Sequence, residues 1–373
     1  MRWVFWIAVV LISHAYVGYP LWLWLRSHWA PRPVLRGPEK LSATAVMVVR
    51  NEETVLARKL ENLLSLDYPK DRFDVIVVSD GSTDNTSAII AEFAQRPRVR
   101  AVIKLEAQGK AAGLNDAVQL VTAPIVLFTD ARQQIEPDAL RCLIENFADA
   151  DVGAASGELM LGDPASGEAN TGTGAYWYIE KKLRELESAS GSVVGATGAI
   201  YCARRSLLDA LPVATILDDV LIPMQIVSRG ARVVFDSRAR AWDSPDLGQK
   251  REFMRKVRTL SGNYQLLQLA PWLLSKKNPI RFEFVSHKLL RLAVPFALLA
   301  LLAASFFLPQ SFYRVALGMQ VMFYGMSLAA VAKLKIGPLS RLADAARTFV
   351  VLNSAAMVAF VNFVTRRKIS WVR

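Results

Sequence analysis

The sequence predicts an α/β fold with a largely parallel sheet, flanked by transmembrane helices. Between residue 41 and about residue 160, short apolar runs alternate with longer segments of 3.6-residue period, which is typical of repeated βα units. Four uncharged runs lie outside this stretch, each close to the roughly 17–25 residues that cross a bilayer. With 53% hydrophobic residues and a mean hydropathy of +0.25, the 373-residue chain is also too apolar for an ordinary soluble protein.

The elements of the predicted sheet follow in order along the chain. Strands are expected at residues 44–49, 74–79, 100–104, 124–129 and 152–159, and helices at 54–65, 86–95, 111–120 and 137–147. Asp84-Asn85 would cap the second helix, and Pro137 stands in the first turn of the fourth. Ligands of open α/β sheets bind at the carboxyl ends of the strands, where Asp80 and Asp130 both fall.

The rest of the central region is predicted to be mainly helical. An amphipathic helix is expected at residues 176–188, followed by small residues at 195–199 that would let a ligand approach the backbone. Asp218-Asp219 opens another helix, and residues 250–262 form a basic one. Aromatic and cationic residues mix over 270–288, which predicts a segment lying on the membrane surface.

The uncharged runs, residues 3–25, 292–313, 315–332 and 348–365, predict up to four membrane segments. The first is expected to be an anchor and not a signal peptide, because it is long and aromatic-rich and no small-x-small cleavage site stands out after it. Basic residues follow it closely, which by the positive-inside tendency places the central region in the cytoplasm; they are Arg26, Arg32, Arg36 and Lys40. We therefore expect a multi-pass protein of the inner (plasma) membrane.

This organisation predicts four parts. They are an anchor at 1–26, a globular domain at 41–265, an interfacial segment at 270–288 and a membrane region at 289–373. Three C-terminal spans would place Arg366 and Arg367 outside, against the positive-inside tendency. One of the three is therefore expected to be re-entrant or to lie on the surface, which leaves two or three spans.

Charge and cysteine content exclude some classes of partner. The net charge is +12, but basic residues cluster beside the hydrophobic runs and at 251–258, without the aromatic interleaving of a nucleic-acid-binding stripe. We expect no nucleic acid partner, and anionic membrane lipids and a diphosphate instead. Cys142 and Cys202 lie far apart without metal-ligand spacing, so both are expected in the core.

Three residues at the predicted sheet edge could carry chemistry. Asp80 enters a Gly-Ser-Thr-Asp turn, where it either caps the turn or accepts a hydrogen bond from the imide N–H of a uracil base. Lys110 follows Gly109 in a turn that resembles a phosphate-binding loop without the full P-loop pattern, and a solvated lysine is the alternative. Asp130 follows a buried apolar run, which favours metal ligation or a ribose contact over a cap.

Two further pairs leave two interpretations open. Asp218-Asp219 could form an N-cap pair, or the adjacent like charges could raise the pKa of one carboxyl as a general base requires. Arg255 and Arg258 lie three residues apart on one helical face, where they form a solvated basic face or clamp a diphosphate.

Taken together, these cues occur in an order that resembles family 2 glycosyltransferases over roughly residues 41–265. The segments are Val-Ser-Asp-Gly-Ser-Thr-Asp at 78–84, Gly-Lys-Ala-Ala-Gly-Leu-Asn at 109–115, Phe-Thr-Asp-Ala-Arg at 128–132 and Leu-Asp-Asp at 217–219. With its flanking spans, the chain is similar to membrane-integrated enzymes of GT-A fold, such as cellulose, hyaluronan and poly-N-acetylglucosamine synthases and ceramide glucosyltransferase.

This resemblance implies roles for the nucleotide side of a site. Arg50, Asn51 and Glu52 would help hold the nucleotide, Asp80 would bind uracil, and Lys110 would contact the diphosphate. The family's Asp-x-Asp is Asp130-Ala131-Arg132 here, so either Arg132 supplies positive charge or Asp130 holds a Mg²⁺ or Mn²⁺ ion together with the phosphates. Arg255 and Arg258 match the family's Gln/Arg-x-x-Arg without the tryptophan that follows it.

On the acceptor side, the resemblance maps Asp219 onto the catalytic base, with Asp218, Thr197 and Gly198 nearby. It implies inverting transfer of a sugar from a UDP-linked donor to a polysaccharide or lipid acceptor. Two alternatives stay open, a lipid glycosyltransferase that forms a glycolipid and a non-catalytic nucleotide-sugar-binding partner in a polysaccharide secretion complex.

Overall fold

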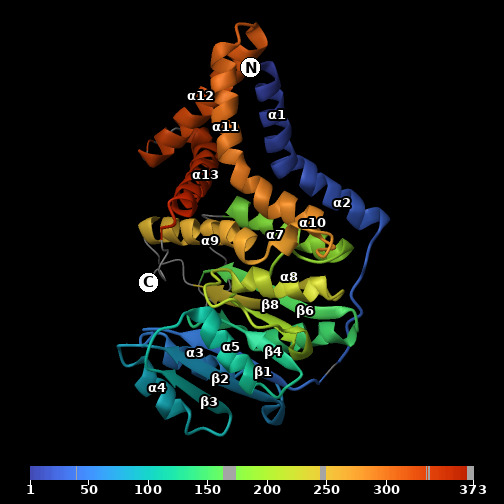
Figure 1. The fold of residues 1–373 in the computed structure, drawn as a ribbon, viewed down its shortest axis with the longest axis vertical. Coiled ribbons are helices and arrows are strands. Elements are labelled where there is room, and N and C mark those ends of the chain that lie inside the picture. Colours follow the sequence, from blue (N-terminus) through green and yellow to red (C-terminus); the bar gives the residue numbers. More distant parts are fainter. Residues whose placement is uncertain (39, 163–173, 244–248, 333, 335–336, 368–373) are drawn as a thin grey trace. The chain divides into compact units, whose positions relative to one another are not determined.

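A computed structural model describes residues 1–38, 40–162, 174–243, 249–332, 334 and 337–367, and Figure 1 shows its elements. The chain divides into two compact units. The membrane unit comprises Met1–Trp22, Leu247–Gln268 and Phe282–Arg373, and the sheet unit comprises Leu23–Asp246 and Leu269–Arg281. Each unit is described by itself.

The sheet unit contains one sheet of eight strands among the described residues, in the order β3-β2-β1-β4-β7-β6-β8-β5. The strands are β1 (Ala43–Val49), β2 (Phe73–Asp80), β3 (Val99–Lys104), β4 (Ile125–Phe128), β5 (Gln134–Ile135), β6 (Val152–Leu161), β7 (Tyr201–Arg204) and β8 (Arg232–Asp243). Every residue of β1 and β4 is buried, as expected for strands covered on both faces.

Strand direction divides the sheet into two halves. β3, β2, β1 and β4 are parallel, which confirms the predicted βα units. β7 runs antiparallel to both β4 and β6, β5 runs antiparallel to β8, and β6 pairs parallel with β8. The sequence did not predict β5, β7 or β8, so the sheet is more mixed than expected.

The helices of the sheet unit begin and end close to the predicted positions. They are α3 (Leu56–Leu64), α4 (Thr86–Phe93), α5 (Lys110–Leu120), α6 (Ala139–Glu145), α7 (Gly174–Ser190) and α8 (Asp218–Ser228). The N-cap of α4 is Asn85, whose side chain makes no capping hydrogen bond, and it is Asp84, one residue earlier, whose carboxylate accepts from Thr86 N at 3.0 Å. α5 packs closely on β1, because a Cβ on Gly113 would lie only 2.7 Å from Val48 Cγ1.

The membrane unit contains four helices, among the described residues, that are long and apolar enough to cross a bilayer. They comprise α1 and α2 within Arg2–Trp29, α10 and α11 within Arg281–Phe307, α12 (Ser311–Val331) and α13 (Ser340–Val364). α9 (Gln249–Leu269), the predicted basic helix, also lies largely in this unit. The predicted run 292–313 is interrupted, because α11 ends at Phe307 and Leu308 is extended.

In each of the first two spans, a five-residue π-helix joins two α-helices. α1 (Arg2–Ser13) continues through His14–Gly18 into α2 (Tyr19–Trp29), and α10 (Arg281–Phe284) continues through Val285–Leu289 into α11 (Leu290–Phe307). The two turns meet where His14 Nε2 lies 3.1 Å from Ser286 Oγ. Residues 281–288, predicted as part of a surface segment, thus continue directly into a span, and the surface location of 270–280 stays a prediction.

Candidate active site

A largely buried lysine, with its side chain 15% exposed, joins two carboxylates at the carboxyl ends of the central strands. Lys110 is the first residue of α5, and its Nζ lies 2.9 Å from Asp130 Oδ1 and 3.0 Å from Asp218 Oδ2. Asp130 comes two residues after β4, and Asp218 is the first residue of α8. Burial lowers the pKa of Lys110, but the two carboxylates outweigh burial, so the pKa is raised and the ammonium stays charged.

Asp219 faces the same small space as Asp130. A Cβ built on Gly198 would lie 3.4 Å from Asp130 Oδ2 and 3.5 Å from Asp219 Oδ2. The main chain next to Gly198 is fixed, because Thr197 N donates to Ser156 Oγ at 3.0 Å and Ala196 N donates to Asp219 O at 2.8 Å. The predicted acceptor residues therefore lie together, and the glycine leaves room between the two carboxylates.

Arg132 contacts an aspartate that the sequence did not identify. Its guanidinium Nη2 lies 2.8 Å from Asp243 Oδ1, and Gln133 Nε2 donates to Asp243 Oδ2 at 3.0 Å. Asp243 is the last residue of β8 and is buried. The arginine at the second position of the Asp-x-Asp match is thus held at the end of the sheet.

The predicted nucleotide-binding turn is fastened to the loop after β2. Asn51, at φ +55°, accepts a hydrogen bond from Thr83 N at 2.7 Å, and Glu52 N donates to Thr86 Oγ1 at 2.8 Å. Burial raises the pKa of Glu52, opposed by Arg132 and assisted by Asp130, which places Glu52 within electrostatic reach of both. Arg50 Nε is a buried donor for which the described residues provide no acceptor.

The Asp80 side chain binds backbone amides of the loop that precedes α5. Its carboxylate accepts hydrogen bonds from Gln108 N at 2.8 Å and from Gly109 N at 2.9 Å. The next residue, Gly81, has φ +62°, and a Cβ there would lie 2.4 Å from Ala107 N, so only glycine fits. Asp80 is thus buried against the loop that precedes Lys110, and its contact with a base stays a prediction.

A second buried lysine lies under the loop that carries Asp130. Lys59 on α3 is 2% exposed, and its Nζ donates to Thr129 Oγ1 at 2.8 Å and to Gln133 O at 2.7 Å. Thr129 Oγ1 donates in turn to Ala199 O at 2.8 Å. Burial lowers the pKa of Lys59 to about 7, partly opposed by the charge of Asp130. Sequence reasoning missed this residue, although Lys59 shares a helical face with the apolar residues of α3.

Arg255 and Arg258 lie on α9, which belongs to the membrane unit. They are three residues apart on one face of that helix, as predicted. Their participation in diphosphate binding stays a prediction.

A divalent cation would find few protein ligands at this site. No group of three or more His, Cys, Asp or Glu side chains in the described part of the chain is arranged to hold a metal ion. Asp130 is the carboxylate to which a cation has access, because its side chain is 42% exposed whereas that of Asp218 is 7% exposed and lies against Lys110. Mg²⁺ is commonly bound by one or two carboxylates together with substrate phosphates, so Asp130 fits such a site only when a diphosphate completes it.

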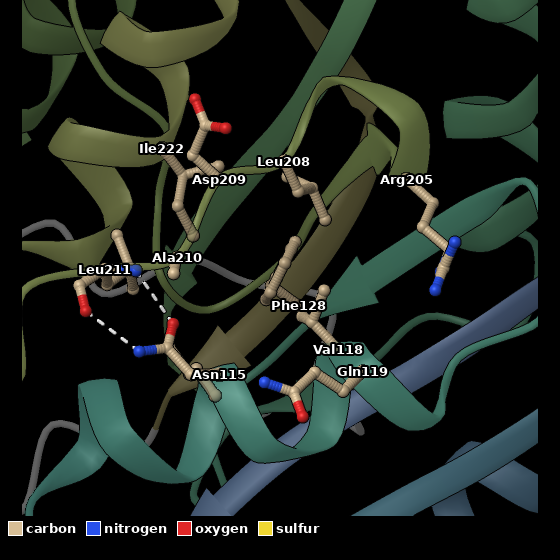
Figure 2. Close-up of a pocket in the computed structure, with 11 residues that line it drawn as sticks. Asn115, Val118, Gln119, Phe128, Arg205, Leu208, Asp209, Ala210, Leu211 and Ile222 are labelled. Atoms are coloured by element: carbon tan, nitrogen blue, oxygen red, sulfur yellow. Dashed lines mark hydrogen bonds between the residues drawn. The ribbon is translucent and has the colours of Figure 1, made fainter.

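A cavity of about 220 Å³ lies between α5, α8 and residues 205–211 (Figure 2). Asn115 holds its edge, because its side chain donates to Leu211 O and accepts from Leu211 N, both at 2.8 Å. Phe128 of β4 and Ile222 of α8 line the cavity, so it lies on the face of the sheet that carries Lys110 and Asp218.

Comparison with known proteins shows which family and which relatives the chain is similar to. The family Glycosyl transferase family 2 matches residues 44–211. A beta-monoglucosyldiacylglycerol synthase from a Synechocystis species is 28% identical over 187 residues, 48% of this chain and 39% of that protein. A poly-beta-1,6-N-acetyl-D-glucosamine synthase from Staphylococcus aureus is 24% identical over 240 residues, 63% of this chain and 58% of that protein. The chain thus spans about two to three fifths of the length of these relatives.

The fold has a close counterpart among solved structures. A mannosyltransferase from Pyrobaculum calidifontis, crystallised with GDP-mannose and Mn²⁺, superposes with a TM-score of 0.71 at 23% identity, covering 98% of this chain and 100% of that chain. This likeness confirms the predicted GT-A fold.

Proposed function

We propose that this chain, whose residues 44–211 form a glycosyltransferase family 2 domain, transfers a sugar from a nucleotide sugar to a hydroxyl group with inversion at the anomeric carbon. The observation that carries the proposal is the arrangement around Gly198. Asp219 and Asp130 both face this glycine, and Lys110 joins Asp130 to Asp218 beside it. A base, a positive charge and an open space are the three parts that such a transfer needs.

In the proposed step, the carboxylate of Asp219 takes the proton of the acceptor hydroxyl as that oxygen attacks the anomeric carbon. The bond from this carbon to the diphosphate breaks, and the nucleoside diphosphate leaves with the electron pair. Lys110 and Arg132 stabilise its developing negative charge, an electrostatic contribution that is often the largest in such barriers. When bound, Mg²⁺ or Mn²⁺ would be held by Asp130 and the donor phosphates and would act as a Lewis acid on the leaving group.

The donor is proposed to be UDP-linked, with Arg50, Asn51 and Glu52 holding the nucleotide, Asp80 near the base, and Arg255 and Arg258 near the diphosphate. The buried donor at Arg50 Nε, for which the described residues provide no acceptor, supports a phosphate contact there. The GDP-mannose complex of the Pyrobaculum enzyme makes a guanine nucleotide the first rival to test.

The acceptor is proposed to be a membrane lipid or a growing polysaccharide. The two curated relatives divide between these classes, since one is named for a glucosylated diacylglycerol and the other for a poly-N-acetylglucosamine. The four apolar helices associate the protein with a membrane. Arg26, Arg32, Arg36 and Lys40 support a cytoplasmic catalytic domain at the inner (plasma) membrane.

The test is release of nucleoside diphosphate by the purified, lipid-reconstituted protein. A panel of UDP- and GDP-sugars is offered with and without Mg²⁺ or Mn²⁺, in the presence of membrane lipids and short glycans. We expect one donor to turn over, and Asp219→Asn to reduce turnover by about 10²–10⁴-fold, the usual contribution of a general base. Asp74→Asn is the matched control, because Asp74 lies near the start of β2, at the opposite end of the strand from Asp80, and pairs there with Arg100.

The outcomes separate the catalytic proposal from its rival. Turnover lost in Asp219→Asn and kept in Asp74→Asn supports the proposed base. Binding of UDP without turnover of any donor would instead identify a non-catalytic partner in a polysaccharide secretion complex.

A further inference from the structure

Tyr201 is a fully buried tyrosine at the centre of the sheet. It begins β7, where it pairs with Phe128, and its ring stacks on the Phe128 ring at a centroid distance of 4.7 Å and an angle of 15°. The residue is 0% exposed. It follows Gly198 by three residues, so the strand that holds Tyr201 continues directly from the segment that faces Asp130 and Asp219.

The hydroxyl of Tyr201 has no hydrogen-bond partner among the residues that the structure describes. A buried hydroxyl without a partner is costly, and such groups in native proteins commonly have a functional reason. Tyr68 provides the contrast within the same unit, because its hydroxyl donates to Leu41 O at 2.5 Å. A phenylalanine at position 201 would keep the stacking and avoid the cost, so packing alone does not explain the tyrosine.

The charges around Tyr201 indicate what its hydroxyl could bind. Burial raises the pKa of Tyr201 well above its usual value, and the carboxylates of Asp218, Asp219 and Asp130 raise it further, so the hydroxyl keeps its proton. Ionised carboxylates are acceptors only. The neutral hydroxyl of Tyr201 is therefore available to donate a hydrogen bond to one of these carboxylates.

Lys110 already donates to a carboxylate that the Tyr201 hydroxyl could bind. In the structure, Lys110 Nζ contacts Asp218 Oδ2 at 3.0 Å, which satisfies part of that buried carboxylate. A diphosphate at the site competes for the same ammonium. The ammonium has three N–H donors, and Asp130 and Asp218 already take two of them. Phosphates that accept more than the remaining donor draw Lys110 away from the carboxylates, and a buried carboxylate without donors is strongly disfavoured.

We infer that Tyr201 is a positioning residue, whose hydroxyl donates a hydrogen bond to the Asp218–Asp219 carboxylates when Lys110 turns toward the donor diphosphate. The inference rests on the proposed function. It assigns Tyr201 to the donor-bound enzyme, in which it keeps Asp218 and Asp219 oriented while the positive charge of Lys110 serves the leaving group.

The test compares Tyr201→Phe with Tyr68→Phe in the full-length, lipid-reconstituted protein. The readouts are the melting temperature, kcat and the KM for the donor. For Tyr201→Phe we expect an unchanged or raised melting temperature, an unchanged KM within about twofold, and a kcat lower by about ten- to a hundredfold, the range for a hydrogen bond to a charged group. For Tyr68→Phe we expect the opposite pattern, a lower melting temperature and an unchanged kcat, because its hydroxyl has a partner away from the site.

Three results would overturn the inference. If Tyr201→Phe turns over as fast as the wild type, the hydroxyl has no role in the reaction. If its melting temperature falls as far as that of Tyr68→Phe, the hydroxyl has a structural partner already. If the wild type itself turns over no donor, the proposed function fails and this role fails with it. Failure of the role alone is distinguishable, because the wild type then turns over a donor and Tyr201→Phe does so equally fast.

Discussion

Replacing Lys59 by methionine should change how stability depends on pH. Lys59 is buried under the Asp130 loop, and burial lowers its pKa from 10.5 to about 7. Between these two values the unfolded chain binds a proton at Lys59 that the folded protein lacks, so the free energy of unfolding rises with pH. From pH 6.5 to pH 9.0 this one group adds about 2.5 kcal/mol, because each pKa unit corresponds to about 1.4 kcal/mol.

The assay is thermal unfolding of the detergent-solubilised protein, followed by tryptophan fluorescence at four pH values between 6.5 and 9.0. A change of 2.5 kcal/mol corresponds to about 5–10 °C in a unit of this size. We expect the wild type to gain that much relative to Lys59→Met as the pH rises, after other titrating groups cancel in the comparison. Lys70→Met, at an exposed position, should follow the wild type.

A constant offset between wild type and Lys59→Met at every pH would refute the reasoning. It would mean that Lys59 keeps its proton in the folded protein through this range. The cost of burying that charge would then be met fully by Thr129 Oγ1, Gln133 O and the nearby charge of Asp130.

Two other changes probe the site and its support. Gly198→Ala adds a Cβ at ordinary contact distance, 3.4 Å from Asp130 Oδ2 and 3.5 Å from Asp219 Oδ2. We expect little change in melting temperature but a fall in nucleotide-sugar turnover of about tenfold or more, because the methyl group occupies the space between the two carboxylates. Equal turnover would show that the acceptor lies elsewhere. Asp236→Ala removes a buried carboxylate that Arg238 and Asn146 contact at 2.7 and 2.8 Å. Denaturant unfolding should show a loss of about 1–3 kcal/mol, because a buried donor of Asn146 loses its acceptor while Arg238 can be solvated, and an unchanged stability would contradict a structural role.

Sequence patterns predicted those parts of the fold in which apolar runs mark buried strands. β4 is an uninterrupted apolar run and β1 is apolar apart from Thr44, and the positions of both were predicted within one or two residues. β8 was missed because five of its twelve residues are charged, including Asp236 and Arg238. The partners that make such charges tolerable in a sheet come partly from tertiary structure, since Glu145 contacts Arg238 at 2.8 Å and Asn146 donates to Asp236 at 2.8 Å. Local pattern does not reveal these distant partners.

The site was predictable where a residue's place along the chain determines its place in space. Asp130 follows β4, and Lys110 and Asp218 each begin a helix, so strand and helix boundaries located all three. Lys59 carried a signal that was overlooked, because a lone lysine interrupts the apolar face of α3. Tyr201 carried none, since its significance depends on an antiparallel pairing with Phe128 that only the folded sheet provides.

The contact between His14 and Ser286 has a consequence for how the protein is made. The two residues are separated by 272 positions, so a ribosome working at about 5–20 residues per second needs tens of seconds to reach the second after the first. During that interval the His14 imidazole cannot pair with the Ser286 hydroxyl, because the serine has not yet been added to the chain. The polar contact between the first apolar helix and the α10–α11 helix therefore forms late in synthesis.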